Sequence, residues 1–380
     1  MTPGVDLSPA LHVMVLGLLV ALGPVSWLWL RSRGGDARQR LSRLTLLTLF
    51  LTFDLVLFGA FTRLTDSGLG CPDWPGCYAS ATPAGAVEHI TAAQAAMPTG
   101  PVTHTKAWIE MVHRYVATGV GVLILTLALA TWAQRRRALP VSPWWPLATL
   151  AWVCVQGAFG ALTVTMKLFP AIVTLHLLGG LFLLTLLCVQ AVAYREQPRQ
   201  VIGASHATLL AVTCGAVWLQ AALGAWVSTN YAVLACSTFP RCQGSWWPPM
   251  DFSQGFELWR PLGMTGSGEH VTFAALTAIH YMHRLAAYGV LALVVATAIH
   301  VREALPRMSR VLWILAAWQL ASGLSNVVLG WPLVAALAHT GGAAALVVAL
   351  TWAIAGSRSV MVGDAATAQR PSIVQERVAR

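Results

Sequence analysis

The chain has 380 residues, of which 57% are hydrophobic and only 10% are charged, and its mean hydropathy is +0.65. Soluble domains carry about 25% charged residues, so this composition excludes a soluble globular protein, and the long apolar blocks exclude a disordered or fibrous one. The 24 Lys and Arg residues outnumber the 14 Asp and Glu residues, but they cluster between apolar blocks. That placement indicates contact with the lipid bilayer and a topology signal, with no nucleic-acid partner.

Apolar blocks of about 20 residues, the length that crosses a bilayer as a helix, predict nine membrane spans. The first block has the position of a signal peptide, but no basic segment precedes it and no small-residue cleavage site follows Leu30. We therefore interpret it as a retained helix. In chain order, the predicted spans are 11–30, 44–62, 107–133, 146–166, 171–193, 207–228, 273–300, 309–330 and 333–355.

The basic residues predict the orientation of these spans. The segments between spans lie alternately on the two sides of the membrane. Of the 24 Lys and Arg residues, 17 lie in the segments of one side and 5 in those of the other, and the side with 17 is expected to be cytoplasmic. The chain is thus expected in the cell inner membrane, with a periplasmic N-terminus and a cytoplasmic C-terminus. Two long loops, at about 63–106 and 229–272, would face the periplasm.

Cysteine positions agree with that topology. Cys154, Cys188 and Cys214 lie in apolar spans, as small buried residues often do. The other four form two Cys-x5-Cys pairs in the two outer loops, each with a Pro at the same place: Cys71 with Cys77, and Cys236 with Cys242. An oxidising compartment favours two disulfides. Free thiols are the alternative, and a zinc site is disfavoured because Cys-x5-Cys is not the usual ligand spacing.

The matching loops belong to an internal repeat. Gly59 precedes Cys71 by 12 residues, as Gly224 precedes Cys236, and both halves contain a Gln 20 residues before a His (Gln156 and His176, Gln319 and His339). We therefore predict an all-α polytopic membrane protein with two repeated four-helix bundles in parallel orientation and one extra N-terminal helix. The predicted domains are 1–43 (extra helix and linker), 44–200, 201–356, and 357–380 (cytoplasmic tail).

Five of the 11 histidines lie inside predicted spans and away from the span ends, where ionisable side chains are costly and usually functional. His113, His176 and His339 would lie roughly 8–9 Å below the outer ends of their helices, at a rise of about 1.5 Å per residue, and His283 somewhat deeper. Two imidazoles at similar depth on neighbouring helices can ligate a planar metal macrocycle from both faces. The pairs His113/His176 and His283/His339 therefore predict two haem sites, and structural histidines are the alternative.

Glycine pairs near two of these histidines also bear on whether the sites bind haem. Gly179-Gly180 and Gly341-Gly342 closely follow His176 and His339. A flat macrocycle needs close backbone approach, which glycine permits, although glycine pairs also serve plain helix packing. Arg114 and Arg284 each follow a predicted ligand, and each is expected either to bind haem propionates or to extend to the membrane interface.

Six segments together resemble the haem A synthase family. They occur in the family's order and spacing and span about 44–355: GAFTRLTDSGLGCPDWPGC (59–77), EMVHR (110–114), QGAFGALTVT (156–165), TLHLLGG (174–180), HYMHR (280–284) and AHTGG (338–342). The resemblance implies an eight-helix bundle with pseudo-twofold symmetry that oxidises the C8 methyl group of haem O, through an alcohol, to the formyl group of haem A. It implies haem O as the substrate in the N-terminal half and bound haem B as cofactor in the C-terminal half.

Residue roles carry over from the family's motifs as expectations. His113 and His176 match the ligands of the substrate haem, His283 and His339 match the ligands of haem B, and Glu110 matches the catalytic carboxylate. The haem O synthase, the terminal oxidase assembly and a second copy of this chain are possible protein partners.

Three features depart from the family pattern. The first span and the tail lie outside it. His280 stands where the first half has Glu110, and it competes with His283 as a ligand for iron. We prefer His283 because an Arg follows it, as an Arg follows His113. Asp54 is interpreted as a hydrogen-bonded neutral acid between helices, with a proton path as the alternative.

Two other functions fit paired histidines. One is a b-type cytochrome that passes electrons from quinol, which would not need a carboxylate in one half alone. The other is a haem transporter or chaperone, which would bind haem without a redox requirement.

Overall fold

The computed structural model describes residues 8–31 and 34–360, and the predicted tail beyond residue 360 lies outside them. Nine helices in this part are long and apolar enough to cross a membrane, which confirms a multi-pass helical membrane protein. They are α1 (Ser8–Arg31), α2 (Ala37–Leu64), α4 (His104–Ala133), α5 (Trp144–Thr165), α6 (Pro170–Ala193), α7 (Ala204–Thr229), α9 (Phe273–His300), α10 (Pro306–Val328) and α11 (Leu333–Ala355).

Local sequence signals set where several of these helices begin. The side chains of Asp36, Thr103 and Thr272 cap α2, α4 and α9 by accepting a backbone N–H from the first turn. Pro170 and Pro306 open α6 and α10, where a missing N–H costs no helical hydrogen bond. Both long loops carry short helices: η1 (Pro83–Ala86) and α3 (Val87–Ala96) in the first, and η2 (Ala232–Leu234) and α8 (Phe252–Gly255) in the second.

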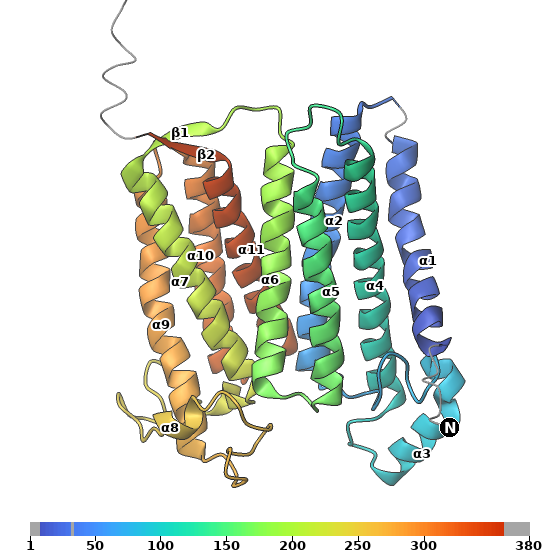
Figure 1. Ribbon diagram of the computed structural model, residues 1–380. Coiled ribbons are helices and arrows are strands. Elements are labelled where there is room, and N and C mark those ends of the chain that lie inside the picture. Colours follow the sequence, from blue (N-terminus) through green and yellow to red (C-terminus); the bar gives the residue numbers. More distant parts are fainter. Residues whose placement is uncertain (1–7, 32–33, 361–380) are drawn as a thin grey trace, which may run out of the picture.

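The long helices form two contiguous groups (Figure 1). In the first helix group, α2 and α5 each pack against both α4 and α6, so α4 and α6 lie diagonally opposite each other. In the second helix group, α7 and α10 each pack against both α9 and α11, which are diagonal in the same way. The groups meet through α2, α6, α7 and α11. The two long loops lie together at one end of the helices (Figure 1).

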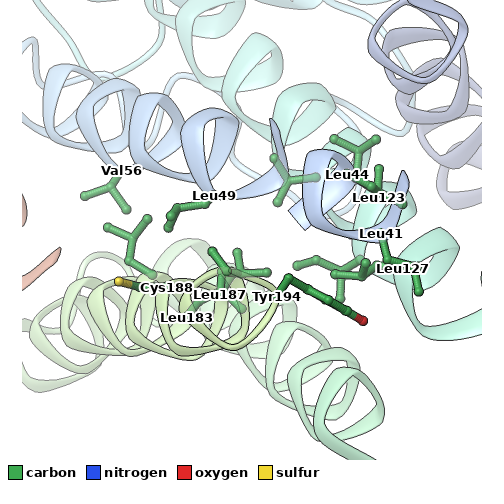
Figure 2. Packing of buried hydrophobic residues seen from close by; sticks show 14 of the residues in the cluster. Leu41, Leu44, Leu49, Val56, Leu123, Leu127, Leu183, Leu187, Cys188 and Tyr194 are labelled. Carbon is green, nitrogen blue, oxygen red and sulfur yellow. The ribbon is translucent and has the colours of Figure 1, made fainter. Parts of the chain in front are cut away.

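Apolar side chains from α2, α4 and α6 fill the centre of the first helix group (Figure 2). Leu44 and Leu49 of α2 and Leu184 and Leu187 of α6 are at most 9% exposed. A second cluster of the same kind joins α7, α9, α10 and α11. Three buried threonines on α2 each donate a hydroxyl hydrogen bond to the backbone carbonyl four residues earlier: Thr45, Thr48 and Thr52. These bonds satisfy the hydroxyl groups inside the apolar core.

One element departs from the predicted all-α fold. Strand β1 (Gln200–Gly203), in the linker between the helix groups, pairs in parallel with β2 (Ser357–Val360), which follows α11. The paired strands lie at the end of the helices opposite the two long loops (Figure 1). Each strand has only four residues, too few for an alternating pattern to be visible in the sequence. The sheet ties the chain after α11 to the linker between the two groups.

The extra N-terminal helix packs on the first helix group. Helix α1 runs along α4 (Figure 1), and a Cβ atom on Gly17 would collide with the Thr118 side chain. Val13 joins the cluster that buries the cysteines Cys71 and Cys77. The N-terminal half of α1 therefore supports both α4 and the loop beside it.

This close approach gives a testable expectation. Gly17→Leu forces α1 away from α4, and overpacking of this kind costs about 1–3 kcal/mol, so the detergent-solubilised protein should melt at a lower temperature. Gly23→Leu is the matched control on the same helix, because a Cβ there meets no atom within 4 Å. Equal melting temperatures for the two variants would contradict the packing of α1 on α4.

Candidate functional site

The four predicted histidine ligands lie in two pairs. His113 of α4 and His176 of α6 are close enough to interact electrostatically, as are His283 of α9 and His339 of α11. Each pair comes from diagonally opposite helices of one group, so the two imidazoles approach each other across the middle of that group. All four lie near the helix ends that carry the long loops, as the sequence predicts.

A glycine on a neighbouring helix makes room for each imidazole. A Cβ atom built on Gly59, Gly160, Gly224 or Gly323 would meet the Cε1 atom of the facing histidine at 2.9 to 3.6 Å. The partners are His113, His176, His283 and His339, in that order. The sequence offered a signal for these glycines, since Gly59 and Gly224 share one spacing to the cysteines, but their contact with histidine required the structure.

The Gly-Gly pairs serve helix packing. Gly179 lies against the Gln156 side chain, and Gly342 lies against Gln319 and Trp318. Gly180 and Gly341 face aliphatic side chains of α2. These contacts explain all four glycines as sites of close helix approach, so they lend no separate support to a macrocycle.

The Nδ1 atoms of the histidines differ between the groups. In the part of the chain that the structure describes, no hydrogen-bond partner reaches the buried Nδ1 of His113 or of His176. In the second group, the Ser322 hydroxyl lies 3.0 Å from Nδ1 of His339. The amide nitrogen of Gln220, a donor, lies 3.0 Å from Nδ1 of His283 and 3.1 Å from the His283 backbone carbonyl oxygen.

Glu110 is buried beneath the first disulfide loop, the ring closed by Cys71 and Cys77. The residue is 4% exposed. The carboxylate accepts a hydrogen bond from the backbone N–H of Cys71 at 2.8 Å and one from the Arg114 guanidinium at 2.5 Å. Arg114 also donates to the backbone carbonyls of Asp73, Pro75 and Gly76 inside the ring.

His280 occupies the corresponding place beneath the second disulfide loop, closed by Cys236 and Cys242. Its Nε2 atom accepts from the Arg284 Nε–H at 3.2 Å, and its Nδ1 atom lies 2.9 Å from the Ala232 carbonyl. Arg284 further donates to the carbonyls of Cys236 and Thr238. Both ring nitrogens of His280 are thus engaged, which leaves His283 as the residue of this segment that approaches His339.

The structure gives the two arginines other partners than those expected. Arg114 and Arg284 both turn toward the disulfide loops, at the ends of their helices, and donate to loop carbonyls. Propionate binding and extension to the membrane interface both stay predictions for these two residues. Asp54 also differs from its expected hydrogen-bonded state: its side chain is exposed on α2, with no hydrogen bond to any residue within 8–31 or 34–360.

Both predicted disulfides are present. The Cys71–Cys77 and Cys236–Cys242 pairs have Cα atoms 4.9 Å and 4.7 Å apart, and their sulfur atoms are buried. The three remaining cysteines, all within the described residues, are free: Cys154, Cys188 and Cys214.

These residues fit a haem in each helix group. Imidazole is a haem-iron ligand, and each group presents two of them from opposite helices, with glycine beside each ring. The Nδ1 atoms of His113 and His176 are buried polar atoms without a partner in the described residues, a costly arrangement that is more often found at functional sites than elsewhere.

Comparison with known proteins agrees with this geometry. A family model described as Cytochrome oxidase assembly protein (COX15-CtaA) matches residues 42–351. The chain belongs to this family. It is 36% identical over 326 residues to a protein of Shewanella oneidensis named haem A synthase, an alignment that covers 82% of this chain and 95% of that protein. Proteins of the same name from Bacillus licheniformis (26% identical, 79% and 90% covered) and Halalkalibacterium halodurans (25% identical, 75% and 86% covered) are also similar.

Family membership places the two histidine pairs and both disulfide loops inside the matched region. Helix α1 lies outside residues 42–351. Its packing on α4 is therefore a property of this chain that the family match does not cover.

Thiol labelling provides a direct test of the disulfides. In the denatured, unreduced protein, a maleimide reagent should modify three cysteines, because four of the seven are joined in two bonds. Reduction before labelling should raise the number to seven. Seven labelled cysteines without reduction would contradict both bonds.

The arginine contacts generate a second test. Arg114→Ala leaves the carbonyls of the first disulfide loop without their buried donor, at a cost of about 1–3 kcal/mol for an unsatisfied group. Amide hydrogen exchange should therefore accelerate in residues 71–80, while residues 236–245 stay unchanged.

Arg284→Ala serves as the matched control, and it should produce the reverse pattern. If either variant accelerates exchange equally in both loops, or in neither, the arginines do not hold their own loops in place.

Proposed function

We propose that this chain is a haem A synthase, an oxidoreductase that converts the C8 methyl group of haem O into the formyl group of haem A for terminal oxidases. Relatives with that name cover most of the chain. The single observation that carries the proposal is the pair of facing histidines in each of two helix groups, set beside a buried carboxylate in one group alone.

The two helix groups are repeats related by a pseudo-twofold axis. Both have the same ring of helix contacts, a histidine pair from the diagonal helices, and an arginine bound to carbonyls of a disulfide loop. The boundaries that we propose are 44–200 for the first half and 201–356 for the second. Both disulfide loops face the periplasm, with the N-terminus on that side and the C-terminus in the cytoplasm.

The first half is the reaction site and the second holds haem B. In the first half, His113 and His176 bind haem O, and Glu110 lies three residues before His113 on the same helix. In the second half, His283 and His339 ligate haem B, which accepts and passes electrons. The assignment is supported by a position at which the two halves differ in acid-base chemistry, where the first half has Glu110 and the second has His280.

The residues around Glu110 hold it for proton transfer. Converting a methyl group to a formyl group removes two hydrogen atoms and adds one oxygen atom, so protons must leave the site. When bound, haem supplies the redox chemistry that amino-acid side chains lack. Arg114 and the Cys71 N–H fix the Glu110 carboxylate by two hydrogen bonds. A carboxylate has about four acceptor sites, so it retains capacity to accept a proton near the methyl group.

Two other functions remain distinguishable by their products. A b-type cytochrome would use both haems for electron transfer and would leave haem O unchanged. A haem transporter or chaperone would release the haem that it binds, with no need for an electron donor. Mass analysis of haem extracted from cells with and without the protein separates all three, because only the synthase yields the formyl product.

The assignment of the halves has its own test. Glu110→Gln keeps the shape of the side chain and removes its charge, so haem B should be retained while haem A formation falls on the order of 100-fold or more. Extracted haem should then consist of haem O or its alcohol.

His283→Ala is the companion variant, and it should remove the haem B spectrum and abolish the reaction indirectly. Wild-type haem A formation by Glu110→Gln, or loss of haem B from His113→Ala with haem B intact in His283→Ala, would overturn the assignment.

A further inference from the structure

Two positions beside the histidines differ in polarity between the helix groups. Ser322, three residues after Gln319, contacts His339, whereas the same position after Gln156 is Phe159. Gln220, four residues before Gly224, contacts His283, whereas the same position before Gly59 is Leu55. The second group therefore supplies a polar partner to each ligand ring, and the first group has apolar residues there.

The hydrogen bonds of Ser322 determine the tautomer of His339. The Ser322 hydroxyl has one hydrogen, and its oxygen lies 2.7 Å from the Trp318 carbonyl, which can only accept. With that hydrogen donated to Trp318, the oxygen accepts from Nδ1–H of His339 at 3.0 Å. The proton of the neutral imidazole is thus held on Nδ1, and Nε2 keeps a free lone pair.

A histidine in this state is a prepared metal ligand. Metal-bound histidines usually donate their other ring N–H to an acceptor, which fixes the ring and raises its basicity. Ser322 is 8% exposed, so water does not compete strongly for the hydrogen bond. His176, whose Nδ1 has no partner within the described residues, lacks this preparation.

We propose that Ser322 is a positioning residue that orients His339 as a strong ligand for haem iron, so that the second helix group would retain its haem while the first exchanges haem freely. The inference rests on the proposed function and deepens it. A synthase must keep its electron-carrying haem through many cycles but release its product each time. Ser322 in the second group and Phe159 in the first would make one haem site retentive and the other exchangeable, although both sites have two histidine ligands.

The test compares variants at Ser322 in a His176→Ala background, which removes a ligand from the first group. The protein is expressed in cells that make no haem O, and haem B transfer to excess apomyoglobin is followed in isolated membranes, so that a variant too unstable to purify is still measured. Ser322→Val removes the hydroxyl, and Ser322→Thr, of nearly the same shape as Val, keeps it.

Haem B should leave Ser322→Val at least about tenfold faster than it leaves the parent, as is typical when the partner of a metal-bound histidine is lost. Ser322→Thr should restore slow release. The haem B midpoint potential should rise in Ser322→Val alone, because a less basic imidazole stabilises ferric iron less. Ser325→Ala is the control, since the Ser325 hydroxyl makes the same bond to the carbonyl four residues earlier and Ser325 is only half-buried.

Equal release rates and potentials for the Val and Thr variants would overturn the role of Ser322, as would an equal effect of Ser325→Ala. These measurements involve no turnover, so they are independent of haem A formation. A protein that makes haem A but shows no Ser322 effect refutes only this inference. A protein that makes no haem A but shows the effect refutes only the proposed function.

Discussion

A polar group inside a bilayer must find its partners within the protein, because the hydrocarbon offers none. In this chain that constraint fixes the relation between the disulfide loops and the helices beneath them. Arg114 and Arg284 carry long charged side chains into the loops and donate to backbone carbonyls there. Each arginine satisfies several loop carbonyls at once and is itself satisfied. Helix α4, which carries His113, therefore also holds the first disulfide loop, and helix α9, which carries His283, holds the second.

The residue below each arginine shows how one scaffold accommodates different chemistry. Glu110 and His280 both accept a hydrogen bond from the arginine one turn later on the helix. Either side chain completes the loop contact, so the fold tolerates the exchange. The acid and the imidazole differ in charge and in proton affinity, however. The position can thus change its chemical role while its structural role is kept.

Sequence periodicity predicted the spans, the disulfides and the histidine pairs because each depends on residue type and spacing alone. Nine apolar blocks imply nine helices, and equal cysteine spacing implies equal rings. The side-chain directions of Arg114 and Arg284 were not predictable from the sequence. A guanidinium can bind a haem propionate, the membrane interface or a loop carbonyl, and residue type and spacing do not distinguish these partners. The short β1–β2 pair was missed because its four-residue strands join segments some 150 residues apart. The Ser322 contact required knowledge of which residue on α10 faces α11.

Charge balance separates the two halves further. The Arg114 guanidinium is neutralised by Glu110 at 2.5 Å, so the first helix group carries no excess charge beside its histidines. Arg284 is 7% exposed and, within the described residues, forms no ion pair, because its neighbour His280 accepts its hydrogen bond as a neutral ring. A buried, unbalanced cation is costly unless an anion lies near it. A haem propionate beside Arg284 would supply that anion even with the guanidinium bonded to the loop, whereas Arg114 needs none. This difference in charge supports our proposal that the second half retains an anionic haem cofactor and that the first half releases its haem product.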